Sequence, residues 1–174
     1  ATYGQVAKLT AADVAAYWFG VSVAIEGDII VVGTYNGEAA YLFRTDDGGA
    51  TYHKVAKLTP RDGNAQDNFG IYVAIDGGTV VVGASGSGSV YVFRTTDSGA
   101  TYGQAAKLTA SNAAVGNLFG YCVAIDGGTV VVGAFGSGSA YVFLETLTMP
   151  QPSFNPTQRP TPAPTQMPIT QPTP

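Results

Sequence analysis

The fold is constrained most strongly by a threefold internal repeat with a period of about 50 residues. Each copy opens with Ala-Thr-Tyr, passes through Lys-Leu-Thr, Phe-Gly, Val-Ala-Ile and Val-Val-Gly, and closes with a Tyr-x-Phe segment. Repeated units of this length bury their apolar faces against their neighbours rather than alone. We therefore expect an array of three similar units, which occupy residues 1–49, 50–99 and 100–149.

The second copy predicts how one unit folds, because its strand and turn signals are the clearest. Segments rich in Val, Tyr and Phe alternate with turns, as expected of antiparallel hairpins. Asp76-Gly77-Gly78 is a tight hairpin signal, and the Pro-, Gly- and Asp-rich stretch 59–68 predicts a loop. Residues 79–84 form a continuous apolar run, which indicates burial on both faces. The four strands are expected at residues 52–58, 69–75, 79–84 and 89–94.

Composition excludes several classes of function. Only 11% of the residues are charged and the net charge is −4, so the clustered basic side chains that nucleic-acid binding requires are missing. No apolar run reaches the roughly 18 residues needed to cross a bilayer, and we expect no membrane insertion. Cys122 is the single cysteine, which excludes an internal disulfide. The chain opens inside a repeat, which we interpret as a portion of a longer protein.

The sequence offers no pattern for catalysis, and we predict that the protein is not an enzyme. His53 is the only histidine, and the matching positions in the other copies are Gly4 and Gly103. Without paired histidines or cysteines, neither a Ser-His-Asp triad nor a zinc site can be built. No catalytic residue, metal ligand or cofactor is therefore expected. Asp62 and Asp67 share one loop, where a weak metal or sugar contact stays open.

The repeated motifs resemble the FG-GAP repeat, the β-propeller blade unit of integrin alpha chains and of many extracellular proteins. In the second copy the resemblance rests on residues 69–77, 80–84 and 88–93, and the other two copies match at the corresponding positions. It implies an all-β fold of three four-stranded antiparallel blade-like repeats. It also implies an extracellular or cell-surface location.

The loops that bind Ca²⁺ in blades of that family are changed in this chain. Such a cation takes 6–8 oxygen ligands, many of them from carboxylates. The corresponding loops are residues 34–38, 85–88 and 135–138, and two of the three contain no carboxylate. We therefore expect no calcium site of the integrin type. Glu38, the one acidic residue in these loops, is expected to be solvated.

A second resemblance is to the Asp-box hairpin of sialidase-type propellers, at residues 45–52 and 95–102. It implies turns in which an aspartate caps backbone N–H groups and has no catalytic role. A sialidase also needs an arginine cluster, whereas the four arginines here are dispersed over two turns, a loop and the C-terminal segment. The residues expected to build the turns are Asp47, Gly49, Asp97 and Gly99.

The register of the repeats displaces one strand. Tyr3 to Leu9 corresponds to the outer, last strand of a unit, whereas the array ends at residues 141–144, one strand before such a strand. Twelve strands are expected, with the third unit left open at its outer edge. An open edge invites strand pairing. The N-terminal strand can fill it in the same chain, or in another molecule as strand addition, which gives a larger ring or a filament.

The loop before the first Phe-Gly carries an aromatic pair, Tyr17 and Trp18, that the other copies lack. Aromatic side chains on a loop can contact a neighbouring protein or stack on a sugar ring. They can equally pack back onto the edge of the array. The sequence does not decide between these interpretations.

The C-terminal residues 150–174 hold nine of the ten prolines, interleaved with Thr and Gln. Because proline fixes φ and removes a backbone donor, this composition predicts an extended polyproline II tail. Pro/Thr-rich stalks are frequent sites of O-glycosylation, and a plain flexible linker is the alternative. The candidate O-glycosylation sites are Thr157, Thr161, Thr165, Thr170 and Thr173.

Together these features favour a non-enzymatic extracellular structural protein. Its copies would associate head to tail by β-strand complementation into a fibre or sheath, with glycans on the tail. The alternative is a portion of an adhesion propeller that recognises a protein or glycan through its loops. The displaced strand favours the first function, and the Tyr17–Trp18 loop favours the second.

Overall fold

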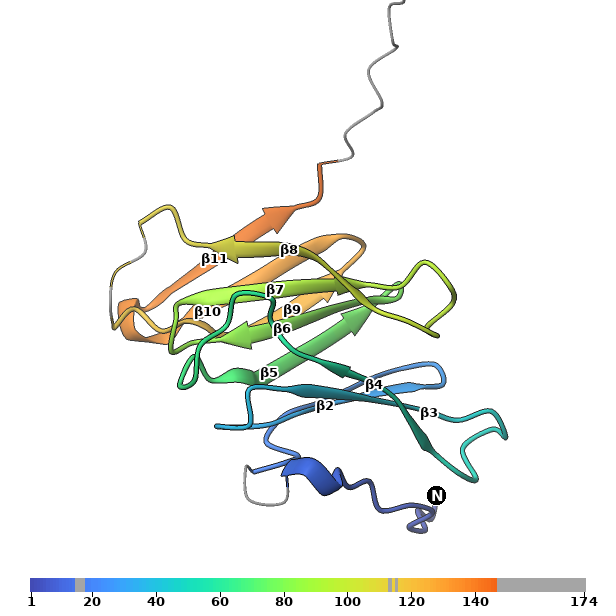
Figure 1. Ribbon diagram of the computed structural model, residues 1–174. Coiled ribbons are helices and arrows are strands. Elements are labelled where there is room, and N and C mark those ends of the chain that lie inside the picture. Colours follow the sequence, from blue (N-terminus) through green and yellow to red (C-terminus); the bar gives the residue numbers. More distant parts are fainter. Residues whose placement is uncertain (15–17, 113, 115, 147–174) are drawn as a thin grey trace, which may run out of the picture.

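The computed structural model describes residues 1–14, 18–112, 114 and 116–146, which form an all-β array (Figure 1). Three antiparallel sheets of four, four and three strands stack on one another. Two short 3-10 helices, η1 (Ala12–Val14) and η2 (Phe135–Ser137), complete the regular structure of this part of the chain. The polyproline II tail expected at residues 150–174 lies outside the described residues.

Each sheet is one blade, and its strands follow one another in chain order from the inner to the outer edge. Blade 1 consists of β1 (Val23–Glu26), β2 (Ile29–Gly33), β3 (Ala40–Arg44) and β4 (His53–Leu58). Blade 2 consists of β5 (Phe69–Asp76), β6 (Thr79–Ala84), β7 (Ser89–Arg94) and β8 (Gly103–Thr109). Blade 3 consists of β9 (Phe119–Asp126), β10 (Thr129–Ala134) and β11 (Ser139–Leu144).

The strands that the second copy predicts are confirmed. β6 and β7 have the expected bounds, β4 and β5 each differ by one residue at one end, and the stretch 59–68 contains neither strand nor helix. The hairpin between β5 and β6 turns at Gly77 and Gly78, whose φ angles are 55° and 72°. Positive φ at both central residues is what a tight two-residue hairpin requires, and glycine adopts it without strain.

Blade 3 has three described strands and an open outer edge, as the register of the repeats predicts, rather than the complete four-stranded unit that the family resemblance implies. The expectation for the N-terminal strand is wrong, because Tyr3 to Leu9 does not form a strand. A strand needs a partner backbone, and β11, whose outer edge is open, lies at the end of the array opposite the N-terminus (Figure 1). The blades also cross the boundaries of the sequence repeats, because the outer strand of blade 1 begins at His53.

The core lies between the blades. Val80 and Val82 of β6 pack against blade 1, and Val81, which points to the other face, packs against blade 3. Because both faces are covered, β6 is buried along its whole length, as the continuous apolar run predicts. The inner strands β1, β5 and β9 lie side by side through the stack. Each blade is thus held by its neighbours, which explains the tandem arrangement.

In blades 2 and 3, the phenylalanine of the Phe-Gly motif packs in the core shared with the blade before it and also contacts two aromatic rings of its own blade. Phe69 is buried, and its ring lies edge-on to the rings of Tyr91 and Phe93, with centroids 5.5 and 6.0 Å apart. Phe119 has the same arrangement in blade 3. Such edge-to-face pairs add to the stabilisation that burial of the rings already provides.

Candidate assembly interface

The contacts between neighbouring blades repeat along the array, and the first of them joins two hairpins. Glu26 of blade 1 accepts hydrogen bonds from the backbone N–H groups of Gly77 (2.6 Å) and Gly78 (3.2 Å) of blade 2. Asp76 of blade 2 accepts one from Gly127 of blade 3 (2.8 Å). The third acidic residue in the series, Asp126, is exposed on the outer side of blade 3, where the described residues provide no further hairpin.

A second repeated contact is a close approach of two backbones. A Cβ atom at Gly33 would collide with the carbonyl oxygen of Gly70 in blade 2, and one at Gly83 would collide with that of Gly120 in blade 3. The two remaining members of this series lie at opposite ends of the array. Gly20, on blade 1, has no atom near its Cβ position, and Gly133, on blade 3, meets only its own blade.

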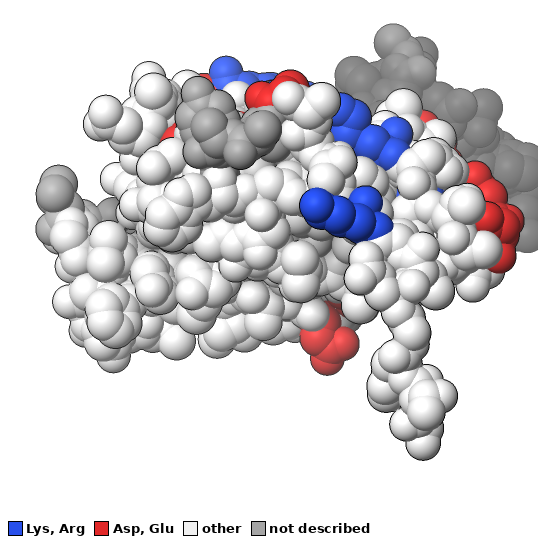
Figure 2. Space-filling view, turned by 90° about the horizontal axis from the view of Figure 1, so that it is seen from below, with Lys and Arg blue, Asp and Glu red and all other residues white. Residues whose placement is uncertain are grey.

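The two outermost faces of the array are apolar and lack the cover that blade 2 has on both of its faces. On blade 3, Val142 is 65% exposed, whereas its counterpart Val92 on blade 2 is 7% exposed. On blade 1, Val23 is 66% exposed, whereas its counterpart Val73 is 6% exposed. Figure 2 views the molecule from the side of blade 1 and shows a surface on which most side chains are uncharged. Exposed apolar faces of this kind are typical of protein interfaces.

The N-terminal segment already lies partly in the place of an outer strand. Leu9 and the buried Ala11 pack against Val32, Tyr41 and Phe43 on the outer face of blade 1. The outer strands of blades 1 and 2 contact the following blade in the same way, because residues at the end of each strand or just after it pack in the core shared with that blade. These residues are Leu58, and Leu108 with Ala110.

A lysine from the outer strand completes a polar cluster on blades 1 and 2. On blade 1, Asp13 accepts hydrogen bonds from Lys57 (2.6 Å) and Tyr41 (3.0 Å), and these bonds lower the pKa of Asp13 to about 2. Lys57 Nζ also lies 5.4 Å from the centroid of the Tyr41 ring. On blade 2, Lys107 donates a hydrogen bond to Asp62 (2.7 Å), and its Nζ lies 5.1 Å from the centroid of the Tyr91 ring.

Blade 3 has the same cluster without the lysine. The Tyr141 hydroxyl donates a hydrogen bond to the Asn112 side chain (2.8 Å), and the described part of blade 3 contributes no outer strand that could supply a cation. Lys8 of the N-terminal segment is the sequence counterpart of Lys57 and Lys107.

The Asp-box residues form two hydrogen-bonded turns. Asp97 accepts hydrogen bonds from the backbone N–H of Thr101 (2.8 Å), from its hydroxyl (2.6 Å) and from the Thr95 hydroxyl (2.7 Å), which lowers the pKa of Asp97 to about 2. Asp47 makes the same bonds in its own turn. Gly49 and Gly99 each donate a backbone N–H to the first threonine of the box.

The other residues that the sequence singled out have varied surroundings. Trp18 is 71% exposed, and its ring lies 5.6 Å from that of Tyr35. Its companion Tyr17 lies outside the described residues, as do the five threonines of the tail, Thr157, Thr161, Thr165, Thr170 and Thr173. Asp62 pairs with Lys107, and Asp67 accepts the backbone N–H of Asn64 (2.8 Å). His53 lies 3.4 Å from the exposed Asp46.

Glu38 is not solvated as expected, because its carboxylate binds the loop that leads into blade 2. It accepts backbone hydrogen bonds from Gln66, Asn68 and Phe69 at 3.0–3.1 Å. Sequence reasoning also missed the hairpin series of Glu26, Asp76 and Asp126. The signal was present, because an acidic residue precedes glycine at the same position of all three copies.

Two classes of site are absent from the described part of the chain. No three His, Cys, Asp or Glu side chains of these residues are grouped so that they could hold a metal ion. No helix among them is long and apolar enough to span a membrane.

The fold and the repeated contacts between sheets define a protein built from propeller-blade repeats. Its sequence matches the FG-GAP repeat at residues 3–53, 52–102 and 102–143, and the chain therefore belongs to the FG-GAP repeat family. None of the curated proteins compared with it matches.

Two solved structures resemble the array. A protein from Lactobacillus plantarum has 17% sequence identity and a TM-score of 0.54, with 73% of this chain and 38% of that chain covered. Sqt1 of Saccharomyces cerevisiae has 16% identity and a TM-score of 0.54, with 76% of this chain and 32% of that chain covered. At these identities the likeness shows the fold alone, and this chain spans 38% of the first structure and 32% of the second.

Proposed function

We propose that this protein is a non-enzymatic structural component of the cell surface or extracellular space whose copies associate head to tail. In the proposed junction, the outer face of blade 3 stacks on the outer face of blade 1 of a second copy. Residues 3–9 of that second copy then pair with β11 as its missing outer strand. The junction is heterologous, so it forms a ring if its rotation closes and a fibre or sheath if it does not.

The observation that carries the proposal is the position of Leu9 and Ala11. They pack on blade 1 as Leu58, at the end of β4, packs on blade 2. The segment before Leu9 therefore lies on the side of blade 1 where the outer strand of a preceding blade would be. The register of β7 and β8, which pairs Val90 with Leu108 and Tyr91 with Lys107, supplies the register of the junction. Transferred to β11, it pairs Ala140 with Leu9 and Tyr141 with Lys8.

For each repeated contact, blade 3 carries one unused partner and the N-terminal end of the chain carries the other. Joining these partners in two copies gives the same junction. Asp126 would cap the Gly27 N–H of the second copy, as Asp76 caps Gly127. Gly133 would meet the backbone at Gly20, and Lys8 would join Tyr141 and Asn112 in the cluster that lacks a cation. The apolar faces around Val142 and Val23 would be covered by each other, and burial of apolar surface is the main driving force of association.

A second copy, rather than the same chain, is the occupant that the geometry favours. The N-terminus and β11 lie at opposite ends of the stack (Figure 1). Closure within one chain would also need a ring of three blades, fewer than the 4–8 of closed propellers. In the assembly, the tail after blade 3 would project from the junctions as a polyproline II stalk carrying O-linked glycans. Nucleic acid has no place in this proposal, because the charge is low and net acidic. Membrane insertion has none either, because the sequence has no apolar run of roughly 18 residues.

The test uses two variants of the full chain, each blocked at one end. Deletion of residues 1–10 removes the donated strand, and Val142→Asp places a charge on the outer face of blade 3 without touching the buried core. Negative-stain electron microscopy and sedimentation velocity should show rings or fibres for the unmodified chain and monomers for each variant alone. Circular dichroism melting of both variants checks that they remain folded.

Mixing the two variants makes the test specific for head-to-tail pairing. The deletion variant keeps its blade 3 end, and the Val142→Asp variant keeps its donor strand, so the mixture should form 1:1 dimers and nothing larger. An unmodified chain that stays monomeric at high concentration would refute the proposal. So would assemblies that persist after either change.

A second candidate function is adhesion through the loop that carries Trp18. The observation that favours it is the exposed Trp18 ring beside Tyr35, since paired aromatic rings offer a surface on which a sugar can stack. A glycan array probed with the Val142→Asp variant and with the same variant carrying Trp18→Ala would test it. Binding that disappears with Trp18 would support adhesion, and the absence of any binding would refute it.

A further inference from the structure

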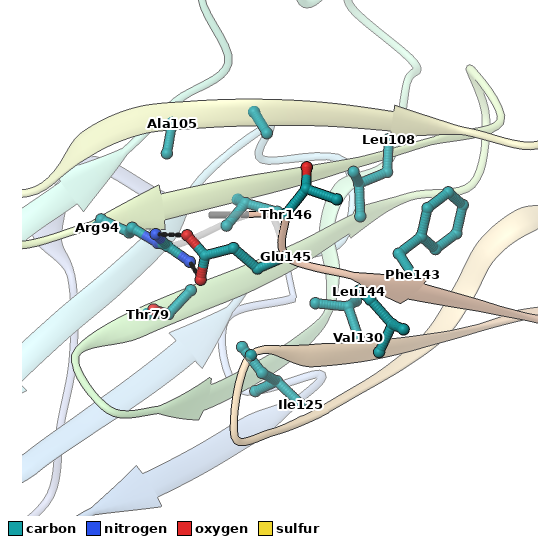
Figure 3. A pocket seen from close by; sticks show the side chains of 13 residues that line it. Thr79, Arg94, Ala105, Leu108, Ile125, Val130, Phe143, Leu144, Glu145 and Thr146 are labelled. Carbon is teal, nitrogen blue, oxygen red and sulfur yellow. Dashed lines mark hydrogen bonds and ion pairs between the residues drawn. The ribbon is translucent and has the colours of Figure 1, made fainter. Parts of the chain in front are cut away.

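A cavity of about 300 Å³ opens between the outer strand of blade 2 and the open edge of blade 3 (Figure 3). Ala105 and Leu108 of β8 line one side, and Val130 and Phe143 of blade 3 line the other. At one end, the guanidinium of Arg94 forms a two-pronged ion pair with the Glu145 carboxylate. The walls are mainly apolar, so the cavity suits an apolar side chain with a polar tip.

The equivalent space between blades 1 and 2 is filled by Tyr102. This side chain, at the edge of β8, packs in the core between the two blades together with Ile29, Val55 and Ala56. The Tyr102 hydroxyl and the Arg44 guanidinium both lie near the Cβ position of Gly99. Burial raises the pKa of Tyr102.

The walls of the two spaces correspond residue by residue. Thr79 stands where blade 1 has Ile29, and Arg94 stands where it has Arg44. Ala105 and Ala106 stand where blade 1 has Val55 and Ala56. The cavity therefore has the surroundings of the Tyr102 site, with smaller side chains at two positions, and it lacks the tyrosine.

We propose that this cavity is the socket for Tyr3 of a second copy of the chain. Tyr3 is the counterpart of Tyr52 and Tyr102 in the three Ala-Thr-Tyr segments, and it is fully exposed in the isolated chain. If residues 3–9 pair with β11 in the register of β7 and β8, Tyr3 takes the position in blade 3 that Tyr102 has in blade 2. This inference rests on the proposed head-to-tail function and names the side chain that anchors the junction.

The socket gives the junction an aromatic anchor. Leu9 and Ala11 already pack on their own blade 1, so their burial contributes little new area when two copies meet. The Tyr3 ring, by contrast, is fully exposed in the isolated chain. An aromatic side chain buries about 150–250 Å² when it is enclosed, so Tyr3 would add new buried area. Aromatic residues that fill a pocket near the centre of an interface usually provide much of its binding energy. The Arg94 guanidinium at the end of the cavity offers a cation beside the ring.

The test measures binding of a synthetic peptide of residues 1–10, labelled at its C-terminus, to the variant that lacks residues 1–10, which keeps its blade 3 end, and to the unmodified chain by fluorescence anisotropy. The peptide should bind and should shorten the assemblies of the unmodified chain. Tyr3→Ala in the peptide should weaken binding at least about tenfold, whereas Tyr3→Phe should change it less than about threefold.

Two changes in the socket complete the experiment. Ala105→Trp fills the cavity and should abolish peptide binding, and Ala105→Val, which restores the residue type of blade 1, should leave it intact and controls for folding. Equal binding of the Tyr3 and Tyr3→Ala peptides would overturn the socket while the head-to-tail function stands. A chain that neither assembles nor binds any peptide would overturn both, and a chain that binds the Tyr3 peptide selectively but stays monomeric would support the socket alone.

Discussion

The Glu38 carboxylate of blade 1 accepts a hydrogen bond from the backbone N–H of Phe69 in blade 2, at 3.0 Å. The same carboxylate accepts bonds from Gln66 and Asn68 in the loop that leads to Phe69. One side chain thus fixes the loop just before the Phe-Gly motif that anchors blade 2. The corresponding calcium-binding loops of the family are rich in carboxylates, and here a single carboxylate holds backbone donors instead.

Replacing Glu38 should loosen the junction between blades 1 and 2. Glu38→Ala leaves three N–H groups without their carboxylate, which should lower the free energy of unfolding by about 1–3 kcal/mol. Urea denaturation measures the loss, and hydrogen exchange should accelerate at Asn68 and Phe69. Glu38→Gln keeps one acceptor oxygen and should cost less. Unchanged stability and exchange in Glu38→Ala would show that the loop is fixed by other contacts.

The close backbone approach between blades 2 and 3 makes Gly83 intolerant of a side chain. Gly83→Ala would place a Cβ against the Gly120 carbonyl oxygen, so the blades must separate. Overpacking of this kind typically costs about 1–3 kcal/mol, seen as a lower melting temperature. Gly103→Ala in the same blade is the matched control, because nothing lies near its Cβ position. Equal melting temperatures for the two variants would contradict the close approach.

The Asp-box turns predict a loss of stability in acid. Hydrogen bonds from Thr101 and Thr95 lower the pKa of Asp97 from 3.8 to about 2, so the folded state favours the charged form. The stabilisation is complete above pH about 4 and is lost as the pH falls toward 2. Carbon-detected NMR titration of the Asp97 carboxyl measures the pKa directly. Thr101→Val removes a hydroxyl donor and should raise it; an unchanged pKa would contradict this assignment.

The sequence predicted the interior of the array well because its signals there are local. Asp76-Gly77-Gly78 determines a hairpin through backbone geometry alone, and the apolar run from Thr79 to Ala84 leaves no polar face to expose. The bounds of β6 and β7 follow directly from these signals. The repeat then transfers the same prediction to the other two copies.

The ends of the array and the contacts between blades could not be predicted in this way. Tyr3 to Leu9 has the pattern of a strand, but pattern does not supply a partner, and β11 lies too far away in the same chain. Glu38 has no counterpart in the other copies, so its position between two blades depends on how the blades stack. Tyr17 and the tail threonines stay predictions.

The third carboxylate of the hairpin series offers a test of the junction that leaves the blades intact. In a background blocked by Val142→Asp, Asp76→Ala should lower the melting temperature, because Asp76 accepts the Gly127 N–H (2.8 Å). Asp126→Ala should not, because Asp126 is exposed at the end of the array.

In the unblocked chain the same change should weaken assembly. A hydrogen bond to a charged group contributes about 1.5–3 kcal/mol, so Asp126→Ala should raise the concentration needed for assembly by about tenfold or more. Light scattering across a dilution series measures that concentration. If Asp126→Ala assembles as readily as the unmodified chain while Asp76→Ala is destabilised, the capping contact is confined to the interior of one chain. The junction would then differ from the contacts between blades.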